Sequence, residues 1–188
     1  MKVNANSVRI GNAIEHQKRL WRVVKREHTM PGKGGAFVQM ELKELKSGTK
    51  LNERFRSSEN IEVVRLDEKE YQFLYADGQE LTLMDNETYE QININKNLLD
   101  GKDVFLQDGM EIMVEFHEGD IIGVALPEDV TLEVTETEPV IKGQTAANSN
   151  KPAVLENGTR IMVPPFIEVG NKVIIKTEDS SYVERAKD

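Results

Sequence analysis

The residue best placed to do chemistry in this sequence is Lys33, which stands alone in the glycine-rich stretch Met30–Phe37 (MPGKGGAF). Pro31 restricts one φ angle, whereas the three nearby glycines permit positive φ angles and a close approach of the backbone to a ligand. The sequence therefore predicts a bare hairpin tip from which one ammonium projects. A solvated lysine in an ordinary glycine-rich turn would have the same pattern. The predicted tip consists of Pro31, Gly32, Lys33, Gly34 and Gly35.

The chemistry that this tip favours is contact with a phosphate backbone. It is not a Walker A loop, because the GxxxxGK[ST] spacing is absent and Gly34 follows Lys33 where a Ser or Thr should bind magnesium. An ammonium on a bare tip with basic flanks suits insertion beside nucleic-acid phosphates. Basic strand residues that are only solvated would look the same in the sequence as basic residues that contact phosphates. The candidates for these contacts are Arg9, Arg22, Lys25 and Arg26.

The sequence offers little for catalysis or for metal binding. His16, His28 and His117 are its three histidines, and none of them has the HExxH spacing of a zinc site. The absence of Cys excludes disulfide scaffolds, zinc ribbons, thiol nucleophiles and iron–sulfur clusters. No GxSxG motif occurs, and carboxylates are too numerous in an acidic chain for any pair to stand out. We therefore expect neither an enzyme nor a metal site.

The elements that must position the tip are β-strands. Short segments rich in Val, Ile, Leu, Tyr and Phe recur between Gly, Asp and Asn turns, and most are too short for helices. This spacing predicts an all-β protein of small barrels or sandwiches. The clearest hairpin spans Tyr71–Met84, with Phe73 and Tyr75 on one face and a turn at Asp77–Gly78. One short helix is predicted at Asn86–Gln91.

Charge is distributed unevenly along the chain, whose formal net charge is -9. Residues 1–64 carry 13 basic and 7 acidic side chains, residues 65–127 carry 4 and 15, and residues 128–188 carry 7 and 11. Each third has enough strands for a small barrel with a closed edge. We predict three domains with these limits: a basic domain at 1–64, an acidic one at 65–127 and a third at 128–188. A polar loop, 142–152, lies within the third.

The composition also predicts the cellular location of the protein. No apolar run approaches the roughly 18 residues that a membrane span needs. The start, MKVNANSVRIG, lacks the apolar stretch of a secretory signal. The absence of Cys fits a reducing compartment. We expect a cytoplasmic monomer with no membrane partner.

Several blocks of this sequence resemble, in the same order, those of a known family. They begin with Pro31–Val38 (PGKGGAFV) and continue through Met84–Gln91 (MDNETYEQ). They end with Lys151–Gly158 (KPAVLENG) and Val163–Gly170 (VPPFIEVG). Each block is weakly specific by itself, but together they cover nearly the whole chain. In this order they resemble bacterial translation elongation factor P.

The resemblance implies an N-terminal KOW/SH3-like barrel and two OB-like barrels in an elongated, L-shaped arrangement that mimics tRNA. It implies binding to both ribosomal subunits between the peptidyl-tRNA and exit sites. There the factor stimulates peptide-bond formation and relieves stalling at consecutive prolines. By the same resemblance, Lys33 reaches the CCA end of the peptidyl-tRNA. It is also a candidate for a lysyl-type extension by a separate lysine-modifying enzyme, and no other cofactor is implied.

The resemblance further implies a contact with mRNA at the exit site. The loop concerned matches a Gly-Asp-Thr-Ala loop of the family, but Gln144 replaces the Asp and so removes its carboxylate. Glu41 stands where a basic residue is often found, which lowers the positive field near the tip. The residues of this loop are Gly143, Gln144, Thr145 and Ala146.

Two alternatives stay open at this point. One is a paralogue of the same fold that acts on other stalling sequences or lacks the modification. The other, from a different class, is a general OB-type RNA-binding protein. Such proteins stack bases on exposed aromatic side chains in a basic groove. This chain is 6% aromatic and its two later thirds are acidic, which disfavours that alternative.

Overall fold

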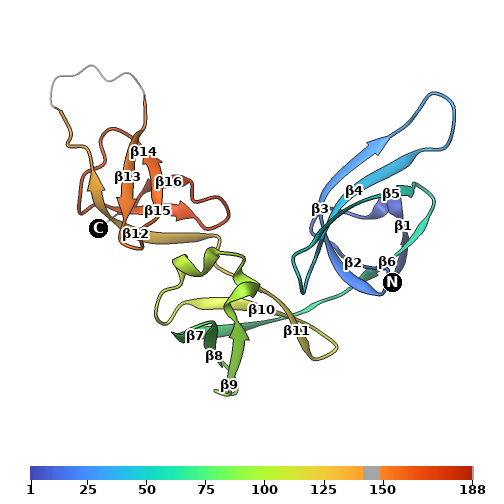
Figure 1. The fold of residues 1–188 in the computed structure, drawn as a ribbon, viewed down its shortest axis with the longest axis horizontal. Coiled ribbons are helices and arrows are strands. Elements are labelled where there is room, and N and C mark those ends of the chain that lie inside the picture. The colour runs from blue at the N-terminus through green and yellow to red at the C-terminus, as the bar shows by residue number, and fades with distance from the viewer. Residues whose placement is uncertain (142–148, 188) are drawn as a thin grey trace. The chain divides into compact units, whose positions relative to one another are not determined.

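The structure is a computed structural model that describes residues 1–141 and 149–187 of the chain. Its regular secondary structure is almost entirely β-strand, arranged in three sheets (Figure 1). The prediction of an all-β protein with three β-sheet domains is confirmed. The helical elements among the described residues are the short 3-10 turns η1 (Ala5–Ser7), η2 (Lys96–Leu99) and η3 (Lys102–Phe105).

The first sheet has six strands in the order β1-β6-β2-β3-β4-β5. Its core follows from strand alternation: Val38, Met40 and Leu42 on one strand are fully buried, and successive side chains point to opposite faces. Trp21, the single tryptophan of the chain, packs in the same cluster. The strands are β1 (Lys2–Asn4), β2 (Ala13–His16), β3 (Arg19–Thr29), β4 (Phe37–Glu44), β5 (Lys50–Arg56) and β6 (Asn60–Val64).

The second sheet has five strands in the order β11-β10-β7-β8-β9. The hairpin predicted at Tyr71–Met84 is present as β7 and β8, but its two-residue loop is Gly78–Gln79, one residue later than expected. Gly78 adopts φ +60, which glycine tolerates without strain. The strands are β7 (Asp67–Asp77), β8 (Glu80–Asp85), β9 (Gln91–Asn95), β10 (Glu111–His117) and β11 (Asp120–Ala125).

Two local predictions in this sheet are wrong. Tyr75 does not share a face with Phe73, because a bulge between them shifts the register and leaves Tyr75 55% exposed. The predicted helix at Asn86–Gln91 is a turn. The Asp85 carboxylate accepts hydrogen bonds from the backbone N–H groups of the two residues that follow Asn86, at 2.8 and 3.2 Å. A side chain that satisfies these donors favours a turn over a helix.

The third sheet has five strands in the order β14-β13-β12-β15-β16. Its buried core includes Leu132, Val134, Leu155 and Val173, from three of these strands. The strands are β12 (Asp129–Thr137), β13 (Lys151–Leu155), β14 (Arg160–Val163), β15 (Lys172–Lys176) and β16 (Tyr182–Arg185).

The described residues form two compact units. The first comprises Met1–Lys69 together with Val114–Val124, the outer part of the β10–β11 hairpin. The second contains the rest of the described chain. The three-domain limits at residues 1–64, 65–127 and 128–188 stay a prediction. The candidate tip and its neighbours lie in the first unit.

Candidate functional site

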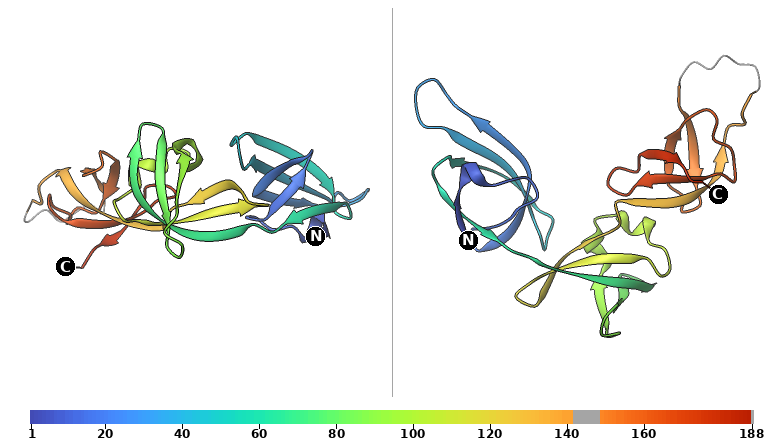
Figure 2. Two further views of the ribbon diagram at one scale, coloured as in Figure 1. Left: turned by 90° about the horizontal axis from the view of Figure 1, so that it is seen from below. Right: turned by 180° about the vertical axis from the view of Figure 1, so that it is seen from behind.

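The Lys33 loop closes the hairpin of β3 and β4, which projects from the first sheet in Figure 1 and Figure 2. The last strand pair before the loop is Thr29 with Phe37, so residues 30–36 form the tip. Gly34 has φ +118, a conformation that residues with a side chain rarely adopt. A Cβ placed on any of the three tip glycines would meet no atom within 4 Å. The tip is uncrowded, and its backbone requires glycine at position 34.

The Lys33 side chain is exposed, like the residues on either side of it from Pro31 to Gly35. No ion pair or hydrogen bond to its ammonium is found among residues 1–141 and 149–187. The amine is therefore not held against a carboxylate of the described chain. Its charge is available to an external anion.

Strand alternation divides the predicted basic residues of β3 between the two faces of the sheet. The register pairs Lys25 with Glu41 and Arg26 with Met40. Paired residues of antiparallel strands project from the same face. Because Met40 is fully buried, Arg26 lies on the core face and Lys25 on the outer face.

On the outer face, Lys25 is partly neutralised by Glu41. Its Nζ lies 3.4 Å from one carboxylate oxygen, and Nζ of Lys50 lies 3.4 Å from the other. Partial burial raises the pKa of Glu41, but hydrogen bonds to the two lysines and attraction by their charges outweigh this effect and lower the pKa. Glu41 therefore reduces the positive field that Lys25 and Lys50 contribute to the outer face.

On the core face, Arg26 is held by Asn6. Its Nη2 donates to the backbone oxygen of Asn6 at 2.8 Å and to Oδ1 at 3.1 Å. Its Nε is buried and has no hydrogen-bond partner among the described residues. The two bonds to Asn6 use the donors of Nη2 and tie the guanidinium to the core-face side of the sheet.

Arg22 is committed to an ion pair within the first unit. Its Nη2 lies 2.7 and 2.6 Å from the two carboxylate oxygens of Glu115 on β10, and Nη1 donates to the backbone oxygen of Gly11 at 3.0 Å. Both side chains are largely buried, with 31% and 13% exposed. A Cβ at Gly123 on β11 would overlap the Glu115 carboxylate, so glycine makes room for this pair.

Arg9 differs from the other three predicted phosphate contacts. It lies in the turn between η1 and β2, where its backbone N–H donates to Asn12 Oδ1 at 2.8 Å. Its side chain is exposed, and within the described ranges its guanidinium has no partner. Of the four, Arg9 thus keeps its charge free in the part of the chain that is described.

Arg54, on the neighbouring strand β5, was missed in the sequence. Its guanidinium carbon lies 3.9 Å from the centre of the Phe37 ring, at the base of the tip. Arg56 follows on the same face of the strand, and both arginines are exposed. Alternation around the buried Phe55 is a signal that could have placed them together on the outer face.

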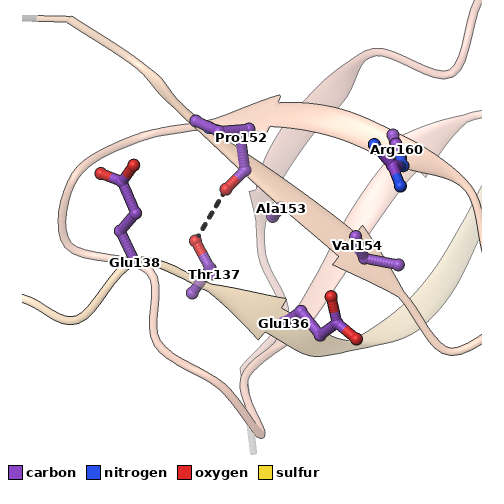
Figure 3. Close-up of a pocket in the computed structure, with 7 residues that line it drawn as sticks. All are labelled: Glu136, Thr137, Glu138, Pro152, Ala153, Val154 and Arg160. Atoms are coloured by element: carbon purple, nitrogen blue, oxygen red, sulfur yellow. Dashed lines mark hydrogen bonds between the residues drawn. The ribbon is translucent and has the colours of Figure 1, made fainter.

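The predicted codon-facing residues Gly143, Gln144, Thr145 and Ala146 lie outside the described residues. The strands on either side of that segment are β12 and β13, and Thr137 Oγ1 donates to the backbone oxygen of Pro152 at 3.0 Å (Figure 3). Beside this bond, the two strands line an open pocket of about 340 Å³, with Arg160 of β14 at its edge. Lys151 is buried and donates to the backbone oxygen of Glu138 at 2.5 Å.

The described residues contain neither a candidate metal site nor a candidate membrane-spanning helix. Among the described residues, no group of three or more His, Asp or Glu side chains is arranged to hold a metal ion. Within the same ranges, no helix has the length and apolar character to span a bilayer.

Comparison with protein families assigns the chain in three segments. Residues 4–61 match the Elongation factor P (EF-P) KOW-like domain, and residues 66–124 match the Elongation factor P (EF-P) OB domain. Residues 130–185 match the C-terminal domain of elongation factor P. Together the three matches cover most of the chain.

Comparison with individual proteins agrees. The chain is 56% identical over 186 residues to elongation factor P of Parvibaculum lavamentivorans, covering 99% of this chain and 100% of the relative. It is 55% identical to elongation factor P of Brucella canis, with the same coverage. Among solved structures, a eukaryotic translation initiation factor 5A from Methanococcus jannaschii matches with a TM-score of 0.54 and 22% identity. That match covers 68% of this chain and 92% of the other, and it supports the fold alone.

Proposed function

Since this chain belongs to the elongation factor P family of translation elongation factors, we propose that it stimulates peptide-bond formation on ribosomes stalled at consecutive prolines. It binds between the peptidyl-tRNA and exit sites. From there Lys33 reaches the CCA end of the peptidyl-tRNA and steadies it. The ribosome supplies the chemistry, so the factor is not itself an enzyme.

The observation that carries this proposal is the free ammonium on an uncrowded tip. Lys33 is exposed, lacks an internal partner in the described chain and is flanked by glycines without side-chain bulk. Such a tip can enter a narrow space lined by phosphate groups, where a bulkier hairpin would collide. The ammonium offers three donors and a compact positive charge, which suit the phosphates and oxygens of an RNA end.

The physical basis for acceleration is positioning rather than acid–base catalysis. Proline is a poor peptidyl donor and acceptor, because its rigid ring can hold the reacting groups out of line. Correct alignment of reacting groups contributes as much as about 7–11 kcal/mol in intramolecular reactions. A factor that orders a flexible RNA end needs charge and a fixed location, and it needs no general base.

The same proposal names the partners. They are both ribosomal subunits, the peptidyl-tRNA, mRNA at the exit site and an enzyme that extends Lys33 with a lysyl-type group. The factor acts as a monomer in the cytoplasm and uses no other cofactor. An extension of the amine suits the tip, because the Lys33 side chain is exposed.

The test is a reconstituted translation assay that compares a peptide with a run of prolines to one without it. Lys33→Ala is expected to lower proline-run synthesis by about tenfold or more, equal to about 1.4 kcal/mol of lost alignment. Lys46→Ala is the matched control, since Lys46 is exposed in the turn at the other end of β4. Equal rescue by the Lys33 and Lys46 variants would remove Lys33 from the mechanism.

The modification is tested separately. Protein purified from its own host is digested, and the mass of the peptide that contains Lys33 is measured. An added mass on Lys33 supports the extension and identifies it. An unmodified lysine in protein from dividing cells would contradict this part of the proposal.

A further inference from the structure

Arg54 lies at the base of the Lys33 tip on the outer face of the first sheet. The register pairs Phe37 with Arg56 and Gln39 with Arg54, so Phe37 and Arg54 are diagonal neighbours. The 3.9 Å between the Arg54 guanidinium carbon and the Phe37 ring centre is well inside the roughly 6 Å of a cation–π contact. The ring therefore fixes where the guanidinium lies.

The stack leaves the hydrogen-bonding capacity of Arg54 unused. Its contact with Phe37 is a cation–π contact over the ring, which is not a hydrogen bond to an oxygen acceptor, and the guanidinium carries five N–H donors. In residues 1–141 and 149–187, no carboxylate or carbonyl accepts from these donors. Arg56, the next residue on this face, also has an exposed side chain without a partner there. This contrasts with Arg22, whose Nη1 and Nη2 both donate to acceptors of the chain, and with Arg26, whose Nη2 donates to Asn6.

The chemistry that completes such a group is a phosphate. A planar guanidinium binds phosphate through two parallel N–H···O bonds, and an aromatic platform reduces the freedom lost on binding. Lys33, Arg54 and Arg56 make this end of the sheet positive. The acidic residue nearest in register is Glu41, the other diagonal neighbour of Arg54 on β4, but its two carboxylate oxygens already pair with Lys25 and Lys50.

We propose that Arg54, held against Phe37, is a further contact of this factor with nucleic acid, binding a backbone phosphate beside the nucleotides that Lys33 approaches. The inference rests on the proposed function, because that function supplies the RNA. It adds a second anchoring point on a different strand. Two anchors, one at the tip and one at its base, restrict the angle at which the hairpin meets the RNA.

The experiment is an equilibrium titration of fluorescently labelled factor with purified ribosomes that carry tRNA in the peptidyl site, at several KCl concentrations. Arg54→Gln is expected to weaken binding about five- to tenfold and to lower the slope of log K against log salt by about one. Arg54→Lys is expected to keep the slope but recover only part of the affinity, because an ammonium cannot form the two parallel N–H···O bonds of a guanidinium. Phe37→Leu is expected to weaken binding although the charge is unchanged.

The matched control is Arg19→Gln. Arg19 is exposed at the far end of β3, where its nearest acidic partner, Glu44, lies 3.8 Å away. Arg19→Gln removes one positive charge from the same sheet, as Arg54→Gln does. A general effect of net charge would therefore weaken binding equally in the two variants. Thermal unfolding of Arg54→Gln is expected to match that of the wild type, because the side chain is exposed.

The outcomes separate this inference from the proposed function. If the wild type does not bind ribosomes, both fall. If the wild type binds but Arg54→Gln or Arg54→Lys equals it in affinity and slope, the Arg54–phosphate contact is overturned and the proposed function is not. Photo-crosslinking from p-benzoylphenylalanine at position 54 is expected to label tRNA or ribosomal RNA. Labelling of a ribosomal protein alone would assign Arg54 to a protein contact and overturn the inference.

Discussion

The positive side chains of β3, the tip and β5 fall into two groups, which differ in whether the charged group has a partner within the chain. Those along the body of β3 are committed: Arg22 pairs with Glu115, Lys25 pairs with Glu41, and Arg26 binds Asn6. Those at the tip end are free in the described structure, namely Lys33, Arg54 and Arg56. The two groups carry the same kind of charge within one hairpin and its neighbouring strand.

The difference shows that basic residues close to one another on a hairpin can differ in whether the fold supplies their partners. Arginines in the body of β3 stabilise the fold, because carboxylates and carbonyls of neighbouring elements surround them. In the described structure, the charged groups of the tip-end cations form no ion pair or hydrogen bond, so they are expected to contribute little to stability. Loss of a committed cation should therefore cost stability, whereas loss of a free one should cost binding.

The largest effect on stability is expected from breaking the ion pair of Arg22 and Glu115. Glu115→Ala leaves a partly buried guanidinium without its carboxylate and should lower the free energy of unfolding by about 1–3 kcal/mol. Urea unfolding followed by the fluorescence of Trp21, the single and buried tryptophan, reports on this unit. Glu15→Ala, at an exposed position on β2 within the same unit, is the control. A double-mutant cycle with Arg22→Ala that gives no coupling would contradict the pairing.

A smaller effect is expected at Gly123. Gly123→Ala should destabilise the unit by about 1–2 kcal/mol, because the new Cβ displaces the Glu115 carboxylate. The same substitution should be nearly neutral when Glu115 is already Ala. Equal costs in both backgrounds would show that the Glu115 side chain is not what the glycine accommodates.

A still smaller effect is expected at Glu41, and it depends on pH. Because the folded state lowers the pKa of Glu41, its stabilising contribution is present above the ordinary value of 4.5 and disappears as the pH falls through the lowered pKa. Glu41→Gln should therefore unfold at lower urea than the wild type near neutral pH. This gap should narrow as the pH falls through the lowered pKa of Glu41 and should close once that carboxylate is protonated in the folded state. A gap that stays constant with pH would rule out the ion pairs as its source.

The smallest effect on stability is expected at the free end. Lys33→Ala should change the free energy of unfolding by no more than about 0.5 kcal/mol, as for other surface substitutions. Matching urea curves for this variant and the wild type, beside a loss of proline-run synthesis, would confirm that the two groups of cations differ in role. A clear loss of stability would place Lys33 in the committed group.

Much of the β architecture was predictable because strands are encoded locally. Alternation and turn residues located the β7–β8 hairpin, and glycines around a lone lysine located the tip. Tyr75 was misplaced because a bulge reverses the alternation, and one extra residue in a strand leaves no distinct mark in composition. The predicted helix is a turn because the Asp85 carboxylate accepts hydrogen bonds from the backbone N–H groups of Glu87 and Thr88.

The candidate site was predictable only in part. Lys33 was found because the residues next to it in the sequence are also its neighbours in the folded loop. Arg22 was expected to face a phosphate, yet it meets Glu115, which lies 93 residues further along the chain. Arg54 was overlooked because its partner Phe37 lies on another strand, and their contact depends on register.

By itself, the sequence determined the β class, the glycine-rich tip and the exposure of its lysine, since each depends on residues within a few positions of one another. Tertiary structure alone decided which positive charges are neutralised. Coulomb attraction and hydrogen bonding act over a few ångströms in space, and strand pairing brings distant residues to that distance. A linear pattern shows where the charges are, and the folded chain decides which of them remain for a partner.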